Sequence, residues 1–217
     1  MRAVGIILAG GNNSRMKELS KKRAVGAMPI AGSYRAIDFA LSNMSNSHIQ
    51  KVAVLTQYNA WSLNEHLSSS KWWDFGRKQG GLFVFTPSIT SDNGFWYRGT
   101  ADAIAQNIAF LKKSHEPYVV IASADAVYKM DYNKVLEKHV ETGADLTIVC
   151  KNAGDKADVS EYGVVSTDIN GRVVDFEEKP LNKVGGLIST GIYVIRRRLL
   201  IQLIENCIAE DRYDFVN

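Results

Sequence analysis

An apolar run near the start of the chain, VGIILA over residues 4–9, ends abruptly at Gly10 and Gly11. Because the run is rich in branched side chains and is bounded by glycines, it predicts a buried central strand that leads into a turn. Glycines in the turn let backbone N–H groups approach a ligand, and Arg15 follows with a guanidinium suited to phosphate. The loop is a candidate phosphate site, but a plain strand-to-helix turn in an α/β domain would read the same way.

Strand and helix patterns alternate along the rest of the chain. Strands are predicted at 51–57, 81–87, 117–123, 145–150 and 187–195, and helices at 34–46 with Ser33 as N-cap, 61–67, from Thr100 onwards, 132–142 and 196–209. Asn170-Gly171 predicts the turn of a hairpin over residues 163–178. This alternation is typical of a doubly wound α/β sheet, in which ligands lie beyond the carboxyl ends of the strands.

Composition limits the classes of partner. The 217 residues are 46% hydrophobic and carry a formal charge of +3, which suits one globular α/β domain and gives no reason to expect nucleic acid or a membrane surface as partner. Cys150 and Cys207 have no metal-ligand spacing, so we expect reduced thiols. With no signal peptide and no apolar stretch long enough to cross a bilayer, the chain is expected to be soluble and cytoplasmic.

Two further places could carry chemistry. Asp125 comes just after the predicted strand 117–123, where a carboxylate could hold Mg²⁺ or could simply cap a turn. In FEEKP, Lys179 could neutralise a sugar phosphate while Glu178 accepts hydroxyls, although spacing alone favours a solvated strand edge with gatekeeper charges. The four histidines show no partnership with a Ser or Cys nucleophile, which argues against hydrolytic triad chemistry.

Several ordered motifs together resemble one family. They are ILAGG, YRAIDFALSNMSNSHI, TQY, WYRGTADAIAQN, ASADAVYKMDY, YGVV, FEEKP and STGIYVI, and they extend from the first residues to the last. The chain resembles the nucleotidyltransferase domain of the glucose-1-phosphate adenylyltransferase (ADP-glucose pyrophosphorylase) family. The resemblance implies a Rossmann-like fold of three layers, α/β/α, around a mixed, mostly parallel sheet. It also implies ATP and glucose 1-phosphate as substrates, Mg²⁺ as cofactor, and ADP-glucose for glycogen synthesis as product.

The resemblance assigns site residues position by position. It places Asp125 as the catalytic and metal-binding aspartate. It places the nucleotide at Leu8, Ala9, Gly10, Gly11, Arg15, Tyr97, Gly99 and Thr100, and the sugar phosphate at Gly163, Glu178, Lys179 and Ser189.

The chain departs from the catalytic members of that family at three places in one pocket. Their GGxGxRL loop is GGNNSRM here, and their GDH around the aspartate is Ala124-Asp125-Ala126. Their RAKPAVPFGG is RAVGAMPIAG here, so Val25 stands where a phosphate-binding lysine is expected. Losing one such preorganised group typically costs about 10²–10³ in rate. These departures resemble the regulatory, weakly active or silent subunit of glycogen biosynthesis, the GlgD type, which assembles with its catalytic paralogue.

Other expectations follow from the resemblance. The full-length protein is expected to form a hetero-oligomer with that catalytic paralogue, a tetramer. Family members continue into a second metal-binding aspartate and a C-terminal left-handed β-helix, so residues 1–217 are expected to be a nucleotidyltransferase domain incomplete at its C-terminal end. An active transferase, with Lys21, Lys22 or Arg23 replacing the missing lysine, is the alternative. A dinucleotide-binding oxidoreductase is disfavoured because the glycine spacing is wrong.

Overall fold

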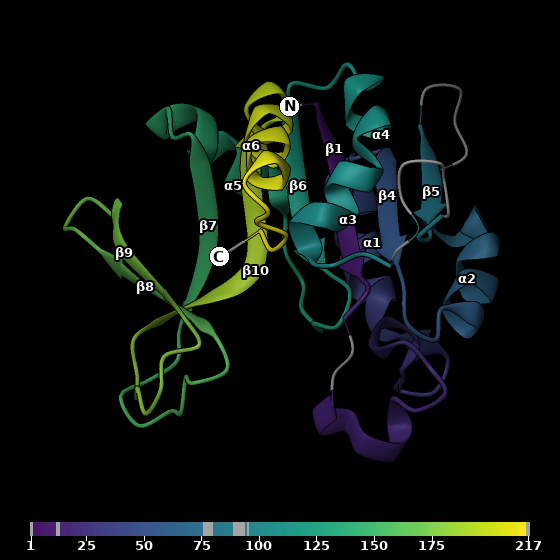
Figure 1. Cartoon of the computed structure of the whole chain (residues 1–217), viewed down its shortest axis with the longest axis horizontal. Helices are drawn as coiled ribbons and strands as arrows, with labels where there is room; N and C mark the ends of the chain where they lie inside the picture. Colours follow the sequence, from purple (N-terminus) through teal and green to yellow (C-terminus); the bar gives the residue numbers. More distant parts are fainter. Residues whose placement is uncertain (1, 12–13, 76–79, 89–93, 95, 216–217) are drawn as a thin grey trace.

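The computed structural model describes residues 2–11, 14–75, 80–88, 94 and 96–215, with the side chains of residues 14, 15, 70 and 71 left out. Strands and helices alternate as the sequence predicts (Figure 1). The strands are β1 (Ala3–Ala9), β2 (Pro29–Ile30), β3 (Tyr34–Arg35), β4 (Lys51–Thr56), β5 (Gly81–Phe85), β6 (Tyr118–Ser123), β7 (Leu146–Asn152), β8 (Gly163–Thr167), β9 (Val173–Glu178) and β10 (Leu187–Arg196). The helices are α1 (Ala36–Asn46), α2 (Trp61–Ser68), α3 (Thr100–Gln106), α4 (Ile108–Lys112), α5 (Tyr132–Thr142) and α6 (Arg197–Ala209), with 3-10 turns η1 (Ser14–Leu19), η2 (Val25–Ala27) and η3 (Ser70–Trp73).

The central sheet is mixed. Its order is β5-β4-β1-β6-β10-β8-β9, and β7 also pairs with β10. The first four strands are parallel, whereas β10 runs antiparallel to β6, β7 and β8. Because β1 and β6 are parallel neighbours, the loops that follow them leave the sheet at the same edge. The hydrogen bond from Ala124 N to Leu8 O (3.0 Å) joins the two loops at their start.

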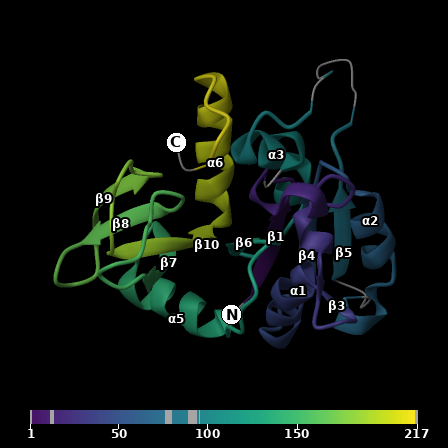
Figure 2. The ribbon, with the colours of Figure 1, turned by 90° about the horizontal axis from the view of Figure 1, so that it is seen from below.

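Successive side chains of the central strands enter different cores, because a strand presents alternate residues to opposite faces. Ile7, Val52 and Val120 pack with α1, α2 and α5 on one face, and Ile6, Ala53 and Ile121 pack with α3, α4 and α6 on the other. Figure 2 shows these two helical layers with the sheet between them. This arrangement confirms the three-layer α/β prediction. In the described part of the chain, no helix is both long and apolar enough to cross a bilayer.

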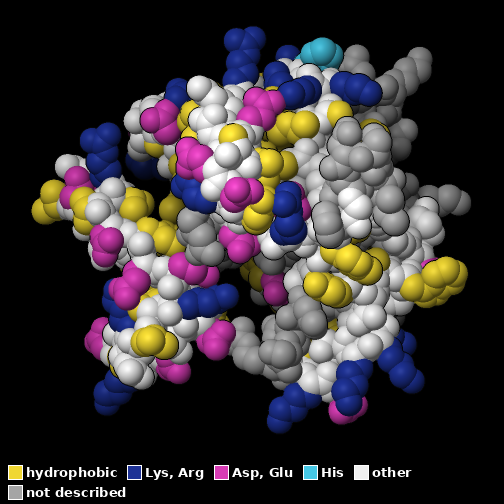
Figure 3. All heavy atoms as spheres, viewed as in Figure 1, with side chains coloured by type: hydrophobic (Ala, Val, Ile, Leu, Met, Phe, Trp, Pro, Cys, Tyr) yellow, Lys and Arg dark blue, Asp and Glu magenta, His cyan; other side chains and the backbone are white. Residues whose placement is uncertain are grey.

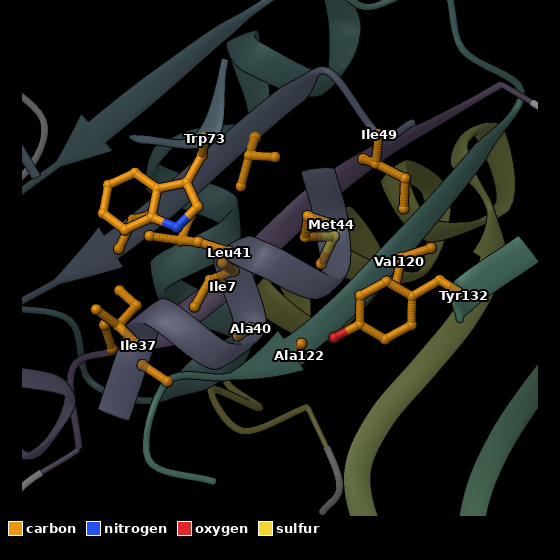
Figure 4. Packing of buried hydrophobic residues seen from close by; sticks show 14 of the residues in the cluster. Ile7, Ile37, Ala40, Leu41, Met44, Ile49, Trp73, Val120, Ala122 and Tyr132 are labelled. Atoms are coloured by element: carbon orange, nitrogen blue, oxygen red, sulfur yellow. The ribbon is translucent and has the colours of Figure 1, made fainter. Parts of the chain in front are cut away.

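Helix α1 lies very close to β1. Ile37, Leu41 and Met44 point from the helix into the sheet, as Figure 4 shows. A Cβ at Gly5 would lie 2.9 Å from the Met44 sulfur, so the glycine is required for this close approach. The strand that precedes the glycine loop is therefore held from one face by tight helix packing.

One helix start differs from the sequence prediction, and a second helix is interrupted. Ser33 does not cap α1, because Tyr34 and Arg35 first pair with β2, and the helix begins after Arg35, whose N–H donates to the Asp38 carboxylate (2.9 Å). The helix at Thr100 has Gly99 as N-cap and breaks at Asn107, where α4 starts. The Asn107 amide donates to Tyr97 Oη and Ala103 O, both at 2.9 Å, and this local bonding competes with a continuous helix.

His139 gives the folded chain a predictable pH dependence. Its ring is 2% exposed on α5, with Nδ1 2.8 Å from Thr147 Oγ1, and burial, followed by the nearby Arg196, lowers its pKa. The imidazole of His139 therefore binds a proton more readily in the unfolded chain than in the folded chain. We expect the free energy of unfolding to fall as the pH drops below about 6.5, by at most about 1.4 kcal/mol per pH unit, and to be independent of His139 above that value.

Denaturant unfolding from pH 8 to pH 5 tests this expectation. His139→Gln should flatten the acidic slope, whereas His115→Gln, at an exposed histidine, should leave it unchanged. An identical slope in wild type and His139→Gln would show that the buried imidazole does not carry the effect.

Candidate nucleotide and sugar-phosphate site

Two adjoining cavities lie at the carboxyl ends of β1, β4 and β6. The first, here called the Asp125 cavity, has a volume of about 230 Å³. Figure 3 shows the molecule hollowed on this side, between the β8–β9 hairpin and the segment that follows β1. The described residues that line the Asp125 cavity are Leu8, Ala9, Gly11, Val25, Gly26, Thr100, Ser123, Ala124, Asp125, Gly191, Tyr193 and Phe215.

The second cavity, here called the Tyr97 cavity, has a volume of about 280 Å³. It shares Leu8, Gly11 and Thr100 with the first, so the two cavities are neighbours with the glycine loop between them. Its described lining is Leu8, Gly10, Gly11, Leu55, Gln57, Tyr58, Tyr97, Arg98, Gly99, Thr100, Ala103 and Asp214. Seven of the eight predicted nucleotide residues thus meet in these cavities, and the eighth, Arg15, has its side chain outside the described atoms.

The last described residues form a wall of both cavities, which the sequence did not predict. Tyr213 O accepts hydrogen bonds from the backbone N–H groups of residues 101 and 102 (2.8 and 3.0 Å). The Asp214 carboxylate accepts from Thr100 N (3.2 Å), and Thr100 Oγ1 accepts from Phe215 N (2.8 Å). A Cβ at Gly99 would overlap with Tyr213 O, so glycine is needed where this segment meets α3.

Arg98, the cation in the described lining of the Tyr97 cavity, is already paired. Arg98 donates to the buried Asp102 carboxylate (Nη2 to Oδ1, 3.1 Å), and its guanidinium lies 3.6 Å from the centre of the Tyr213 ring. Burial raises the pKa of the Tyr97 hydroxyl, and Asp102 adds to this rise while the hydrogen bond from Asn107 opposes it. The Tyr97 hydroxyl therefore stays neutral at physiological pH and can act as a hydrogen-bonding group.

Charge in the Asp125 cavity is negative. The Asp125 carboxylate is exposed and accepts a hydrogen bond from Ser123 Oγ (Oδ1, 2.5 Å). None of the described residues that line this cavity is a lysine or an arginine. Val25 lies in the wall, so the departure noted in the sequence is located inside the cavity. The described lining therefore contains the Asp125 carboxylate, and it has the apolar side chain of Val25 at the position where the resemblance implies a lysine.

The turn that carries Val25 is held from two helices. Arg35 Nη1 donates to Ala27 O at 3.3 Å and to Ser62 O at 3.4 Å, linking η2 to α2. Beside it, His66 Nε2 lies 2.6 Å from the Asp38 Oδ1 that belongs to α1. These contacts tie η2 to the core, so we infer that the position of residue 25 relative to Asp125 is well defined.

The predicted sugar-phosphate residues lie together on β8, β9 and β10, outside both cavity linings. Glu178 and Lys179 are adjacent at the end of β9, with Nζ 3.8 Å from Oε1, and Lys179 is largely exposed. A Cβ at Gly163 would lie 2.9 Å from Glu178 Oε2. Ser189 Oγ lies 3.1 Å from the hydroxyl of Tyr193, which lines the Asp125 cavity. Tyr193 therefore connects the predicted sugar-phosphate residues with the Asp125 cavity. Burial raises the pKa of its hydroxyl, which therefore stays neutral.

A divalent cation would find one carboxylate in the Asp125 cavity. Among the residues that the structure describes, no group of three or more His, Cys, Asp or Glu side chains could enclose a metal ion. This donor set fits Mg²⁺, which commonly takes one or two carboxylates and leaves its other positions to water and substrate phosphates. The described side chains do not offer enough ligands for a metal ion that is held chiefly by protein atoms. Asp125, with Ser123 hydrogen-bonded to it, is the group that would hold Mg²⁺.

Several cavity residues escaped prediction from the sequence. Tyr193 gives no regular period-two signal with Ser189 and Gly191, because β10 is irregular between Ser189 and Ile192, with Gly191 at a φ of 72°. Gln57 ends a predicted strand and Tyr58 follows it, at the edge where ligands bind. The segment 213–215 carries no such signal, because a short polar and aromatic stretch without periodicity does not show where it will pack.

Comparison with known proteins decides the family. The model of the family described as "Nucleotidyl transferase" matches residues 4–214. The chain belongs to this nucleotidyl transferase family. It is 42% identical over 214 residues to the glucose-1-phosphate adenylyltransferase of Clostridium novyi (strain NT), covering 98% of this chain and 56% of that protein. It is also 42% identical over 207 residues to the enzyme of the same name from Thermosipho africanus, covering 94% of this chain and 50% of that protein.

This nucleotidyl transferase chain spans about half the length of the curated relatives it matches. The match confirms the family that the ordered motifs predicted. The cavities lie at the carboxyl ends of the parallel strands, which is where ligands bind in open α/β sheets.

Proposed function

We propose that this nucleotidyl transferase chain is part of a glycogen-biosynthesis subunit of the glucose-1-phosphate adenylyltransferase type, which binds nucleotide, sugar phosphate or both. In this proposal it has little or no catalysis of its own and modulates a catalytic paralogue in a hetero-oligomer. One observation carries the proposal. The Asp125 cavity retains its carboxylate, but Val25 occupies the position of the expected lysine, and no lysine or arginine is among the described residues that line the cavity.

The proposed loss follows from the chemistry of the parent reaction. A phosphate oxygen of glucose 1-phosphate attacks the α-phosphorus of ATP, a new P–O bond forms, and the bond to the bridging oxygen breaks so that pyrophosphate leaves. Bound Mg²⁺ would neutralise part of the phosphate charge. Negative charge gathers on the departing pyrophosphate, and a preorganised ammonium aimed at that charge stabilises it. Val25 offers no such charge, while Asp125 and the glycine loop still suit binding.

An active transferase is the alternative, with Lys21, Lys22 or Arg23 supplying the missing charge. Lys21 Nζ pairs with Glu18 Oε1 at 2.6 Å, and none of the three belongs to either cavity lining. This geometry favours the first proposal, because a substitute cation would have to leave its present place to reach the phosphates.

Calorimetry of the intact protein against ATP with Mg²⁺, and separately against glucose 1-phosphate, tests the proposal. We expect at least one ligand to bind with a dissociation constant below about 1 mM, the upper range of enzyme–substrate affinities. A pyrophosphate-release assay on the same sample should show little or no turnover. Addition of the protein to a catalytic relative should then change the turnover of that relative. Failure of both ligands to bind, or rapid turnover by the isolated protein, would contradict the proposal.

A further inference from the structure

The loop that carries Asp125 is long and has no regular structure. Residues 124–131 connect β6 to α5 without forming a helix or a strand. At its start, the loop is tied to the sheet by the Ala124 N to Leu8 O hydrogen bond. The Asp125 side chain has Ser123 Oγ as its described hydrogen-bond partner, and Ser123 precedes the loop. Something else must hold the far end of the loop if the carboxylate is to keep one position.

Asn43 of α1 holds that far end. Its side chain is 3% exposed, Nδ2 donates to Tyr128 O (3.0 Å), and Oδ1 accepts from Met130 N (3.1 Å). One side-chain amide thus bonds the C=O of one residue and the N–H of the residue two further on, as the N–H and C=O of a single residue do in a parallel ladder. One turn later, at the C-cap of α1, Ser47 Oγ accepts from Tyr132 N (2.9 Å).

These bonds shorten the free part of the loop. The anchors at Ala124 and at Tyr128 leave residues 125–127 between them, and Asp125 is the first of these. Fixing the backbone on both sides of a side chain reduces the number of conformations it can adopt. The anchors come from the face of the sheet opposite α3, so they lie outside both described cavity linings.

We propose that Asn43 is a positioning residue for Asp125, acting through the backbone of residues 128–130. The ordering of the loop is a property of the fold, whereas its consequence for Mg²⁺ and nucleotide rests on the function proposed above. The substitution that isolates the effect is Asn43→Asp. It keeps the size of the side chain and an acceptor for Met130 N, but it places an acceptor against Tyr128 O, where a donor is needed.

Amide hydrogen exchange of the intact protein gives the first readout. The Ala124 amide is the reporter, because it is hydrogen-bonded, buried and adjacent to Asp125. We expect Asn43→Asp to speed exchange at Ala124 and Met130 by about tenfold, the change that corresponds to loss of roughly one hydrogen bond. Amides of residues 119–122 in β6 should keep their rates. Asn46→Asp, the same change at an exposed asparagine of the same helix, should alter neither.

Nucleotide affinity gives the second readout. We expect Asn43→Asp to reduce the affinity for ATP with Mg²⁺ by about tenfold while changing the affinity for ATP in EDTA by less than twofold. A purely structural loss would weaken both equally. If Asn43→Asp does not fold, Ser47→Ala replaces it, with faster exchange at Tyr132 and a smaller rise at Ala124.

The two readouts separate the two proposals. Unchanged exchange at Ala124, or an equal rise throughout β6, would overturn the positioning role of Asn43 whatever the ligand data show. Faster exchange at Ala124 in a protein whose wild type binds neither ATP nor glucose 1-phosphate would support the positioning role and overturn the proposed function.

Discussion

Replacing Val25 by lysine is expected to raise ADP-glucose formation by the intact protein by about 10²- to 10³-fold, the value of one preorganised group aimed at transition-state charge. Val25 is half-buried in the wall of a cavity of about 230 Å³, so the longer side chain has room to extend toward bound phosphates. The readout is pyrophosphate release from ATP, Mg²⁺ and glucose 1-phosphate.

Two variants control for that gain. Val25→Gln adds length without charge and should leave turnover near the wild-type level. Val140→Lys adds the same charge at an exposed position of α5 and should have no effect. If Val25→Lys gives no more product than Val25→Gln, the missing charge is not what limits catalysis, and the regulatory proposal loses its chemical basis.

Asp125→Ala is expected to have the second large effect. In the Val25→Lys background it should lower turnover by about 10²-fold or more, because Asp125 is the one carboxylate in the described lining of the cavity and the group that would hold the cation. In the wild-type background it should remove the gain in ATP affinity that Mg²⁺ provides. Steady-state kinetics and calorimetry with and without Mg²⁺ measure the two effects.

Asp125→Asn distinguishes charge from shape at this position. The amide oxygen can still accept from Ser123 Oγ, as the carboxylate does at 2.5 Å, so a loss equal to that of Asp125→Ala assigns the effect to the negative charge. Asp155→Ala, which removes an exposed carboxylate outside both cavities, is the matched control. Retention of the Mg²⁺ effect in Asp125→Ala would rule Asp125 out as the metal ligand.

Much of the fold could be predicted because it depends on local patterns. The alternation of Ile6 and Ile7 between two cores is a direct result of strand geometry, and the Asn170-Gly171 turn forms the predicted hairpin, with Gly171 at a positive φ of 77°. The helix boundaries were less certain. The prediction of Ser33 as N-cap was wrong, because Tyr34 and Arg35 form strand β3, which pairs with β2, and the helix begins only after them.

The candidate site was predictable in part. Gly10 and Asp125 follow neighbouring parallel strands, so their meeting at one edge follows from the order of strands and helices. Tyr193 and the segment 213–215 were not predicted, because their place depends on the path of β10 and on how the chain returns over α3. The roles assigned to Gly163, Glu178, Lys179 and Ser189 stay predictions, since these residues lie beyond the described cavity walls.

The sequence by itself determined the α/β layering, the glycine loop, the acid at position 125 and the valine at position 25, because each of these depends on residue type and short-range spacing. The resemblance already implied that Val25 and Asp125 share one pocket, but only the tertiary structure decided that no described cation lines that cavity and that Asn43 binds the far end of the Asp125 loop. Those relations join residues that are distant in the chain, and their distances follow from how the helices pack on the sheet, which no local pattern encodes.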